Sequence, residues 1–485
     1  MGSISAALNN ATSGLAAASR RADIVSNNIA NALTPGYSRR EISVSEQIVA
    51  GTGAGITIDG VKRANDPAIT AERRGADGIA ARDQIIATTY SDFNNALGEP
   101  DDLYSFFSKF DNLESSLRDL AETPESAPLQ NQVLASAKSL VASFNQLSQV
   151  TQDTRARADQ DIARQVDFVN ATVAEIEDLN TQIAALQAGN RDSSGLEDQR
   201  KVLIDQVSEI IPVREIRRDF GEVDLMTNEG VFLIAGAQRE LEFTPTSFMT
   251  AELSYANGNL SGLSIDGVEV TPGQSQQGMT AGTLAGYFAV RDDVAPTFQG
   301  QLDSLARDVM ERFEGIDATL PAGSPGLFTD AGAAFDAANE VGLAGRIEIN
   351  AAVDPAVGGE VWRLRDGLGA AAEGPSGSAT FIRQMLDSLT ELRNAPAGAQ
   401  ISGEYSAAGA AAAVTSVIGA HRVVAETALA SSAARAQGLE DAELSAIAVD
   451  TDVELAKLIE IEQAFAANAR VIQTAEQMLA LLMEI

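Results

Sequence analysis

The chain has 485 residues, enough for roughly two to four domains, and 45% of them are hydrophobic, so a buried core is expected. Its 68 Asp and Glu against 34 Lys and Arg give a formal net charge of −34, which argues against nucleic acid and anionic membranes as partners. Cysteine is absent and there is one histidine, which excludes disulfides and sites built from thiolates or several histidines.

The first predicted helix covers about residues 3–33 and ends before Pro35, because proline lacks a backbone donor and disfavours helix at the residue before it. Pro35-Gly36 is typical of a type II turn. Apolar residues in this helix repeat every seven positions, the a/d pattern of a helix that packs on another helix. We call them the N-terminal seam: Ile4, Leu8, Ala11, Leu15, Ala18, Ala22, Val25 and Ile29.

The next part of the chain is predicted to be mostly helical. Residues 37–64 alternate in polarity and predict short extended segments. Apolar residues at 3–4 spacing then predict a helix over 106–120. Residues 129–188 contain neither glycine nor proline and predict one very long helix, and another helix from about residue 196 closes before Pro212.

From about residue 213 the pattern changes to alternating apolar and polar residues, which predicts antiparallel strands. Asp266-Gly267, inside the segment 264–269, fits a hairpin with a type I′ turn. Helical patterning returns over 295–314, a strand is predicted at 346–350, and helices are expected again from residue 379.

The last predicted helix covers 452–485 and repeats the heptad pattern of the first. We call its rows the C-terminal seam: Leu458, Ile461, Phe465, Asn468, Ile472, Ala475, Leu479 and Leu482. Asn468 is either a partly exposed residue or a buried one that fixes register and partner number. Residues 440–485 hold ten Asp/Glu and two Lys/Arg. The basic doublets elsewhere are either solvated surface or face such acidic stretches; they are Arg20-Arg21, Arg39-Arg40 and Arg73-Arg74.

Helices at both ends and strands between them predict a multidomain, mainly α fold with an inserted antiparallel β-rich portion and discontinuous domains. Its long coiled-coil-like helices are expected from both termini and from residues 90–211. Three domains are predicted: a terminal coiled-coil core of residues 1–60 and 441–485, a long-helix domain of 61–215, 281–318 and 376–440, and a β-rich outer domain of 216–280 and 319–375.

No pattern in the chain predicts catalysis or a cofactor. His421 lies in an alanine-rich helix, and no serine–histidine–aspartate triad can be assembled around it. The glycines at 51, 53 and 55 precede a predicted strand, whereas a phosphate cradle needs a helix there. We therefore predict no catalytic, metal-binding or cofactor-binding residues, and no enzyme activity.

Two segments carry a resemblance to a known family. Residues 26–39 hold SNNIANA and TPGYSR, and residues 463–472 read QAFAANARVI. They resemble the N- and C-terminal signatures of the bacterial flagellar axial proteins, which comprise rod, hook and hook-associated subunits. Segments 60–66, 196–200 and 345–350 are similar to the hook-associated subunits of the hook–filament junction.

The resemblance implies a secreted structural subunit, exported by the flagellar type III route without a cleavable signal, and the first residues show no such signal. It implies polymerisation with copies of itself at the distal end of the hook, between hook subunits below and the next hook-associated protein above. The terminal helices would form the inner core, and an export chaperone would hold the C-terminal helix.

Three alternative functions are compatible with parts of the sequence. Another axial subunit, of hook or rod, is the first, although long helices over 129–211 argue against it. An enzyme attached to an axial scaffold would need a catalytic constellation in 213–375, and an adhesin-like coiled coil would carry an anchor or a secretory signal.

Overall fold

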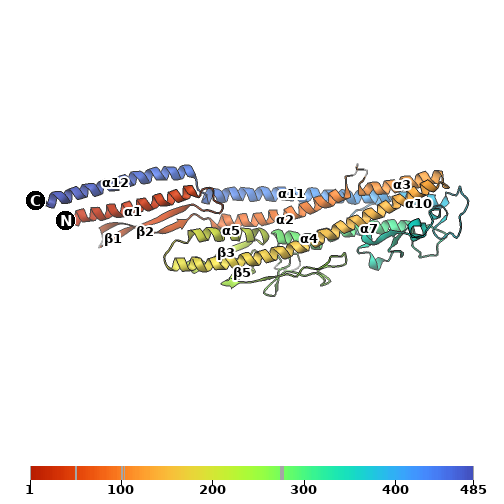
Figure 1. Ribbon diagram of the computed structural model, residues 1–485, viewed down its shortest axis with the longest axis horizontal. Helices are drawn as coiled ribbons and strands as arrows, with labels where there is room; N and C mark the ends of the chain where they lie inside the picture. The colour runs from red at the N-terminus through yellow and green to blue at the C-terminus, as the bar shows by residue number, and fades with distance from the viewer. Residues whose placement is uncertain (1, 50–51, 100–101, 103, 274–277, 484–485) are drawn as a thin grey trace. The chain divides into compact units, whose positions relative to one another are not determined.

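The computed structural model describes the whole chain except residues 1, 50–51, 100–101, 103, 274–277 and 484–485 (Figure 1). It is mainly α-helical with small antiparallel sheets, as predicted. Contacts divide it into two compact units. The first unit is Met1–Ile79, Phe168–Glu240 and Ser432–Ile485; the second unit is Ala80–Asp167 and Leu241–Ser431. The predicted three-domain division stays a prediction.

The first unit contains both terminal helices and most of the longer strands. Its elements are α1 (Gly2–Ala30), β1 (Arg40–Val49), β2 (Thr52–Arg63), α5 (Ser194–Ile210), β3 (Val213–Arg217), β4 (Val223–Thr227), β5 (Phe232–Ala235), β6 (Ala237–Gln238) and α12 (Thr451–Met483). It also holds parts of three helices that are shared with the second unit: α2 (Pro67–Leu97), α4 (Ala127–Ala188) and α11 (Ala407–Ile447).

Two antiparallel sheets form in the first unit. Strands β3 to β6 pair in sequence order. Strands β1 and β2 form one long hairpin, paired from Arg40 with Arg63 outward and interrupted by register shifts. The sequence predicted only short extended segments there. The hairpin is longer because it packs along α1, a contact between distant segments that local alternation does not encode.

The second unit is built around helices and carries only short strands. Its further elements are α3 (Phe106–Glu122), β7 (Leu241–Glu242), β8 (Ser264–Ile265), β9 (Val268–Glu269), α6 (Thr283–Ala289), a π-helical turn (Val290–Val294), α7 (Ala295–Phe313), β10 (Phe328–Asp330), α8 (Leu343–Arg346), β11 (Ile347–Ile349), α9 (Arg363–Asp366), α10 (Thr380–Thr390), β12 (Arg393–Asn394) and β13 (Glu404–Tyr405).

Aromatic side chains centre the core of the second unit. The Phe106 ring packs edge-to-face on Phe144 at a centroid distance of 4.9 Å, and Phe93 stacks on Phe298 at 4.4 Å. Such pairs add roughly 0.5–1.5 kcal/mol beyond their buried area. The core therefore joins α2, α3, α4 and α7 into one packed body.

Several predicted elements can be compared with the observed ones. The hairpin at 264–269 is confirmed, with Asp266 and Gly267 at φ +48° and +75° as a type I′ turn requires. Residues 319–375 hold less strand than predicted: only β10 and β11, with short helices and turns. Helix does not run continuously from residue 379, because β12 and β13 pair between α10 and α11.

By length and composition alone, the helical stretch from Ala407 to Leu481 is apolar enough to cross a membrane. Its most apolar part has another explanation. Ala407, Ala411, Val414 and Ile418 are buried in the core of the second unit, so their hydrophobicity serves internal packing.

Candidate functional site

Helices α1 and α12 pack against each other within the first unit (Figure 1). The pairing is antiparallel: Gly14 of α1 lies beside Asn468, and Asn28, further along α1, bonds to Glu454 near the start of α12. The two terminal helices therefore pair within one chain.

The structure places the N-terminal seam along the inner side of α1. Ala11, Ala18 and Val25 are buried. The other five members are half-buried: Ile4, Leu8, Leu15, Ala22 and Ile29. Three of the eight members are alanines, and Leu15 follows Gly14 in the sequence. Because alanine and glycine are small, the helices approach closely but bury little apolar area.

The C-terminal seam holds the inward residues of a helix that is otherwise largely exposed. Ala475 is buried, and five members are half-buried: Leu458, Ile461, Asn468, Ile472 and Leu479. Phe465 is 44% exposed at the edge of the seam. The side chain of Leu482 lies outside the described residues. A role of either seam in assembly stays a prediction.

Asn468 contacts α1 at Gly14, which has no side chain. A Cβ on Gly14 would lie 3.0 Å from the Asn468 amide, so the contact depends on glycine there. The amide also donates to the carbonyl of Ala464 at 3.0 Å. Asn468 is therefore half-buried, and its amide is hydrogen-bonded within its own helix. Its burial lies between the exposed and the buried position that the sequence left open.

Asn28 is fully buried and uses all of its hydrogen-bonding capacity. Its Nδ2 donates to the Arg40 carbonyl at 2.9 Å and to Glu454 Oε2 at 2.8 Å. Its Oδ1 accepts from the Tyr37 hydroxyl at 2.8 Å and from the Arg40 N–H at 3.0 Å. One side chain therefore ties α1, the following turn, β1 and α12 together.

The partners of Asn28 are held in place in turn. Glu454 is buried and accepts from Lys457 Nζ at 2.8 Å through its other oxygen. Burial raises the pKa of Tyr37, which keeps its hydroxyl a donor. Sequence reasoning quoted Asn28 only as part of a signature. The signal that sequence reasoning missed was a polar residue next to Ile29, a member of the N-terminal seam, on the packed face of the helix.

The turn after α1 requires glycine at residue 36. Pro35 and Gly36 form the predicted type II turn, in which Tyr37 N–H donates to the Thr34 carbonyl at 3.1 Å and Gly36 has φ +79°. A Cβ on Gly36 would lie 2.3 Å from Val202 Cγ2. Gly36 thus serves both the backbone conformation and the approach of α5.

The basic doublets separate into different environments. Arg20 and Arg21 are exposed. Arg73 forms ion pairs with Asp77, Asp205 and Glu443, the last from the acidic C-terminal segment. Although burial opposes it, these carboxylates raise the pKa of Arg73. The interpretation that a doublet faces the acidic segment is therefore confirmed for Arg73.

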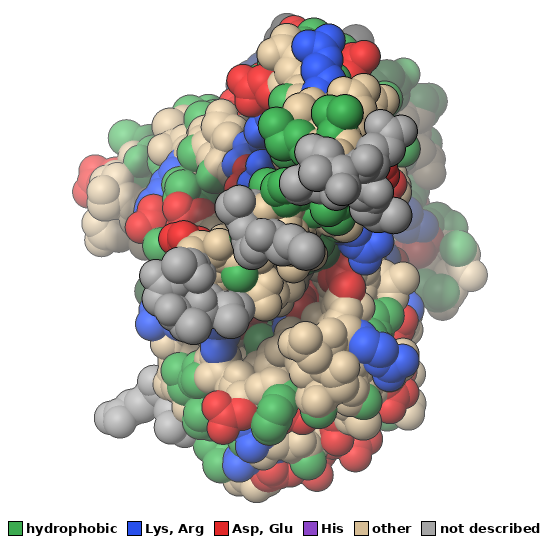
Figure 2. Space-filling model, turned by 90° about the vertical axis from the view of Figure 1, so that its left-hand side faces the viewer, with side chains coloured by type: hydrophobic (Ala, Val, Ile, Leu, Met, Phe, Trp, Pro, Cys, Tyr) green, Lys and Arg blue, Asp and Glu red, His purple; other side chains and the backbone are tan. Residues whose placement is uncertain are grey.

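A second set of apolar side chains on α12 is exposed. Ile459 and Leu481 point away from the C-terminal seam, whereas Leu455 and Met478 flank it. All four side chains are 49% to 62% exposed. We call them the outer stripe. Figure 2, seen from the left-hand side of Figure 1, shows hydrophobic side chains at the surface among acidic and basic ones.

A hollow of about 580 Å³ lies between α1, α12 and the β1–β2 hairpin. Its apolar wall includes Ala17, Ala18, Ile42 and Ile461. The small residues of α1 leave this space open.

The arrangement offers surfaces for packing rather than groups for chemistry. Among the residues that the structure describes, no group of three or more His, Asp or Glu side chains could hold a metal ion. His421 is half-buried and stacks on Tyr90 with ring centroids 5.4 Å apart. That contact gives the histidine a packing role.

Three family models match the chain. The model described as "Flagellar hook-associated protein FlgK helical domain" matches residues 90–319. The models "Flagellar basal body rod FlgEFG protein C-terminal" and "Flagella basal body rod protein" match residues 443–485 and 8–37. The two ends and the helical middle of the chain are thus each similar to a flagellar protein.

Curated relatives agree with the family models. Flagellar hook-associated protein 1 of Escherichia coli (strain K12) is 26% identical over 346 residues, which cover 66% of this chain and 59% of that protein. The protein of the same name from Bacillus subtilis (strain 168) is 23% identical over 489 residues, covering 93% and 92%.

A solved structure of the flagellar hook junction protein FlgK from Burkholderia pseudomallei matches 54% of this chain and 46% of that one at 19% identity. Its TM-score of 0.43 is too low to establish a common fold. The sequence relatives and the family models support a flagellar hook-associated structural protein that is not an enzyme. They confirm the resemblance indicated by the sequence: this chain is similar to flagellar hook-associated protein 1.

Proposed function

We propose that this chain polymerises at the distal end of the flagellar hook and forms the hook–filament junction through α1 and α12. The observation that carries the proposal is that α12 has apolar residues on two sides. The C-terminal seam faces α1, while the outer stripe remains exposed. A helix that is apolar on two sides gains stability when a second surface covers it.

The magnitude of that gain follows from exposure. Fully burying a Leu, Ile or Met side chain contributes roughly 1.5–3 kcal/mol. The four side chains of the outer stripe are about half exposed, so covering them contributes roughly 3–6 kcal/mol per subunit. Because association itself costs roughly 4–15 kcal/mol, this gain contributes to assembly together with the other contacts between subunits.

The proposed partners are copies of this chain, hook subunits below and the next hook-associated protein above, at an extracellular position. An export chaperone on α12 is part of the proposal, because the outer stripe needs cover before assembly. Support comes from the names of the relatives and from the two kinds of family model that match the ends and the middle.

A substitution on the outer stripe tests the role of α12. Ile459 is 57% exposed, so Ile459→Asp should leave the monomer folded and block capping of hooks. Ile459→Leu keeps the apolar area and should assemble. Val424→Asp, at a 68% exposed position of α11, adds the same charge away from the terminal helices and should also assemble. Normal filaments with Ile459→Asp would refute the proposal.

Removing the gene from the motile host tests the junction itself. The proposal expects complete hooks without filaments, with flagellin released to the medium. Another axial role, in hook or rod, is favoured by the family models at the two ends and would leave no complete hooks. Electron microscopy of the isolated basal structures separates the two outcomes.

A further inference from the structure

A basic cavity of about 380 Å³ lies within the first unit, away from the α1–α12 pair. Its wall is formed by the first turns of α2, by α5, by β3 and by the residues after β2. Seven of its side chains are cationic against three glutamates, in a chain with a net charge of −34: Arg63, Arg74, Arg200, Lys201, Arg214, Arg217 and Arg218. At about 30 Å³ per water, the cavity has room for roughly a dozen waters.

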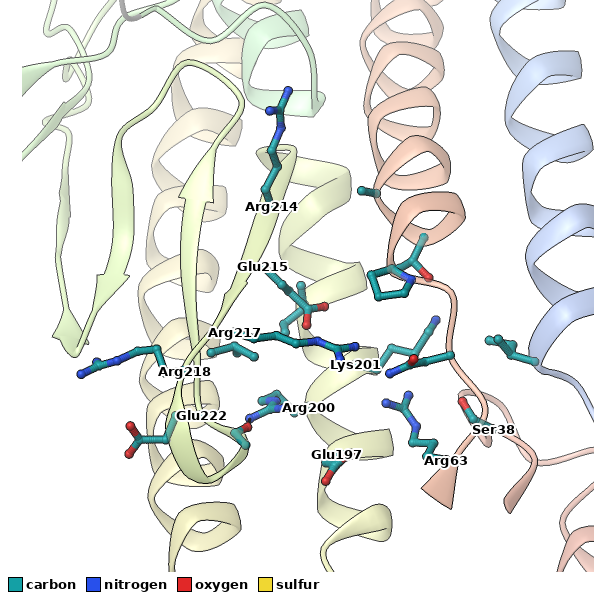
Figure 3. Close-up of a pocket in the computed structure, with 18 of the residues that line it drawn as sticks. Ser38, Arg63, Glu197, Arg200, Lys201, Arg214, Glu215, Arg217, Arg218 and Glu222 are labelled. Atoms are coloured by element: carbon teal, nitrogen blue, oxygen red, sulfur yellow. Dashed lines mark hydrogen bonds between the residues drawn. The ribbon is translucent and has the colours of Figure 1, made fainter. Parts of the chain in front are cut away.

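In the part of the chain that the structure describes, four of these cations pair with a carboxylate, whereas three do not: Arg200, Arg214 and Arg217. Arg63 pairs with Asp198, and Lys201 pairs with Asp205. By contrast, no carboxylate of the described residues lies within 4.0 Å of the guanidinium of Arg200 or of Arg217. In Figure 3 the Arg217 side chain reaches toward Lys201, whereas Arg218 points away.

Neutral groups position Arg200, and they bond to only one of its guanidinium nitrogens. Its Nη1 donates to Asn180 Oδ1 at 2.7 Å and to the Gly221 carbonyl at 2.8 Å. Burial lowers the pKa of Arg200; Glu215 and Glu197 oppose the shift, while the nearby charges of Arg63 and Arg217 add to it. The cavity therefore holds more positive than negative side chains, and the guanidinium of Arg200 has no carboxylate of a described residue in direct contact.

Two further donors at the wall lack acceptors. Arg74 Nη2 and Ser38 Oγ are buried and have no hydrogen-bond partner among the described residues. An unsatisfied buried donor costs roughly 1–3 kcal/mol, more when it is charged. An acceptor brought into the cavity would relieve that cost for donors that can turn toward it.

We propose that this cavity binds a compact, multiply charged oxyanion of the phosphate class, held by the guanidinium groups of Arg200 and Arg217. Planar guanidinium forks bind such groups bidentately, which gives geometric specificity as well as strength. Since Arg200 is on α5 and Arg217 on β3, the bound anion bridges a helix and the edge of a sheet. The inference concerns a separate site and does not depend on the proposed junction role.

Titration calorimetry of the full chain with inorganic pyrophosphate, at an ionic strength fixed with chloride, tests the proposal. Arg217 is exposed, so Arg217→Ala should fold normally by circular dichroism. Losing its charged hydrogen bonds should weaken binding about tenfold or more. Arg20→Ala is the matched control: Arg20 is exposed on α1 of the same unit and does not line the cavity. It should bind within about twofold of the unchanged chain, because screened surface charges contribute little.

Equal weakening in the two variants would show non-specific attraction to surface charge and would overturn the proposal. So would the absence of binding by pyrophosphate. If pyrophosphate does not bind and Arg217→Ala nevertheless impairs capping of hooks, the cavity receives a carboxylate of a neighbouring subunit instead. Slower hydrogen exchange in β3 and α5 on adding pyrophosphate, absent in Arg217→Ala, would place the anion in this cavity.

Discussion

Replacing Asn28 by alanine should loosen the α1–α12 pair. The change removes four hydrogen bonds, one of them to the buried carboxylate of Glu454. A bond to a charged group contributes roughly 1.5–3 kcal/mol and a neutral one roughly 0.5–1.5 kcal/mol. Only the Glu454 bond joins α1 to α12, so we expect a loss of about 1.5–3 kcal/mol for opening the pair; the other three bonds hold the turn and β1 on α1.

The assay has to report on the first unit alone. Trp362, the single tryptophan, lies in the second unit, so its fluorescence is unsuitable. Hydrogen exchange of the α1 and α12 amides measures local opening directly. A loss of about 1.5–3 kcal/mol corresponds to protection factors roughly 10-fold to 100-fold lower in both helices. Asn27→Ala is the matched control, because Asn27 is the exposed neighbour and its side chain faces solvent.

An aspartate at the same position separates hydrogen bonding from size. Asn28→Asp keeps the shape but turns the Nδ2 donor into an oxygen 2.8 Å from Glu454 Oε2. Two buried carboxylates repel, so this variant should open more readily than Asn28→Ala. Adding Glu454→Gln supplies a donor and should restore much of the protection. If Asn28→Ala and Asn27→Ala exchange alike, the network does not hold the pair and the reasoning is refuted.

Two further predictions concern pH and backbone conformation. Burial raises the pKa of Asp303 to about 6 from 3.8, so the folded second unit binds a proton that the unfolded chain releases between these values. Its free energy of unfolding should therefore rise by about 2 kcal/mol as pH falls from 7.5 to 4.5. Urea unfolding followed by Trp362 fluorescence measures this pH dependence, and Asp303→Asn should abolish it. An unchanged pH dependence in Asp303→Asn would contradict the prediction. Gly36→Ala should cost the first unit roughly 2–4 kcal/mol, because φ +79° and the 2.3 Å approach to Val202 both oppose a side chain. Gly230→Ala, at φ +93° with open space around it, should lower the free energy of unfolding by only about 1 kcal/mol, measured by circular dichroism in urea. Equal losses in Gly36→Ala and Gly230→Ala would refute a steric contribution from Val202.

Local patterns predicted the long helices well. The helix expected over 129–188 is α4, Ala127–Ala188, and the one expected to close before Pro212 ends at Ile210. Periodicity encodes which face is buried, so the seams also lie on the inward sides of their helices. Helix α2 was not predicted. Gly75 and Gly78 lower its intrinsic propensity, and burial of side chains such as Phe93 overrides that preference.

The polar contacts could not be predicted in the same way. The partners of Asn28 come from the turn, from β1 and from α12, and the bond to Glu454 joins positions 426 residues apart. The pair of Arg73 with Glu443 spans 370 residues. Composition showed opposite charges in these regions, but only the folded chain selects which carboxylate meets which guanidinium. The basic cavity was missed for this reason, since its cations come from four separate segments.

The terminal helices combine two kinds of contact with different strengths. Between them, small residues such as Ala11, Ala18 and Gly14 bury little apolar area, so the polar network of Asn28 contributes a large share of the pairing. On the outside, Ile459 and its neighbours of the outer stripe are about half exposed and contribute less to the monomer than a buried side chain would. Asn28→Ala should therefore lower protection of α1 in the isolated chain, whereas Ile459→Asp should leave it unchanged and act only when copies meet. If Ile459→Asp also exposed α1, the outer stripe would belong to internal packing, and α12 would have no free surface for a neighbour.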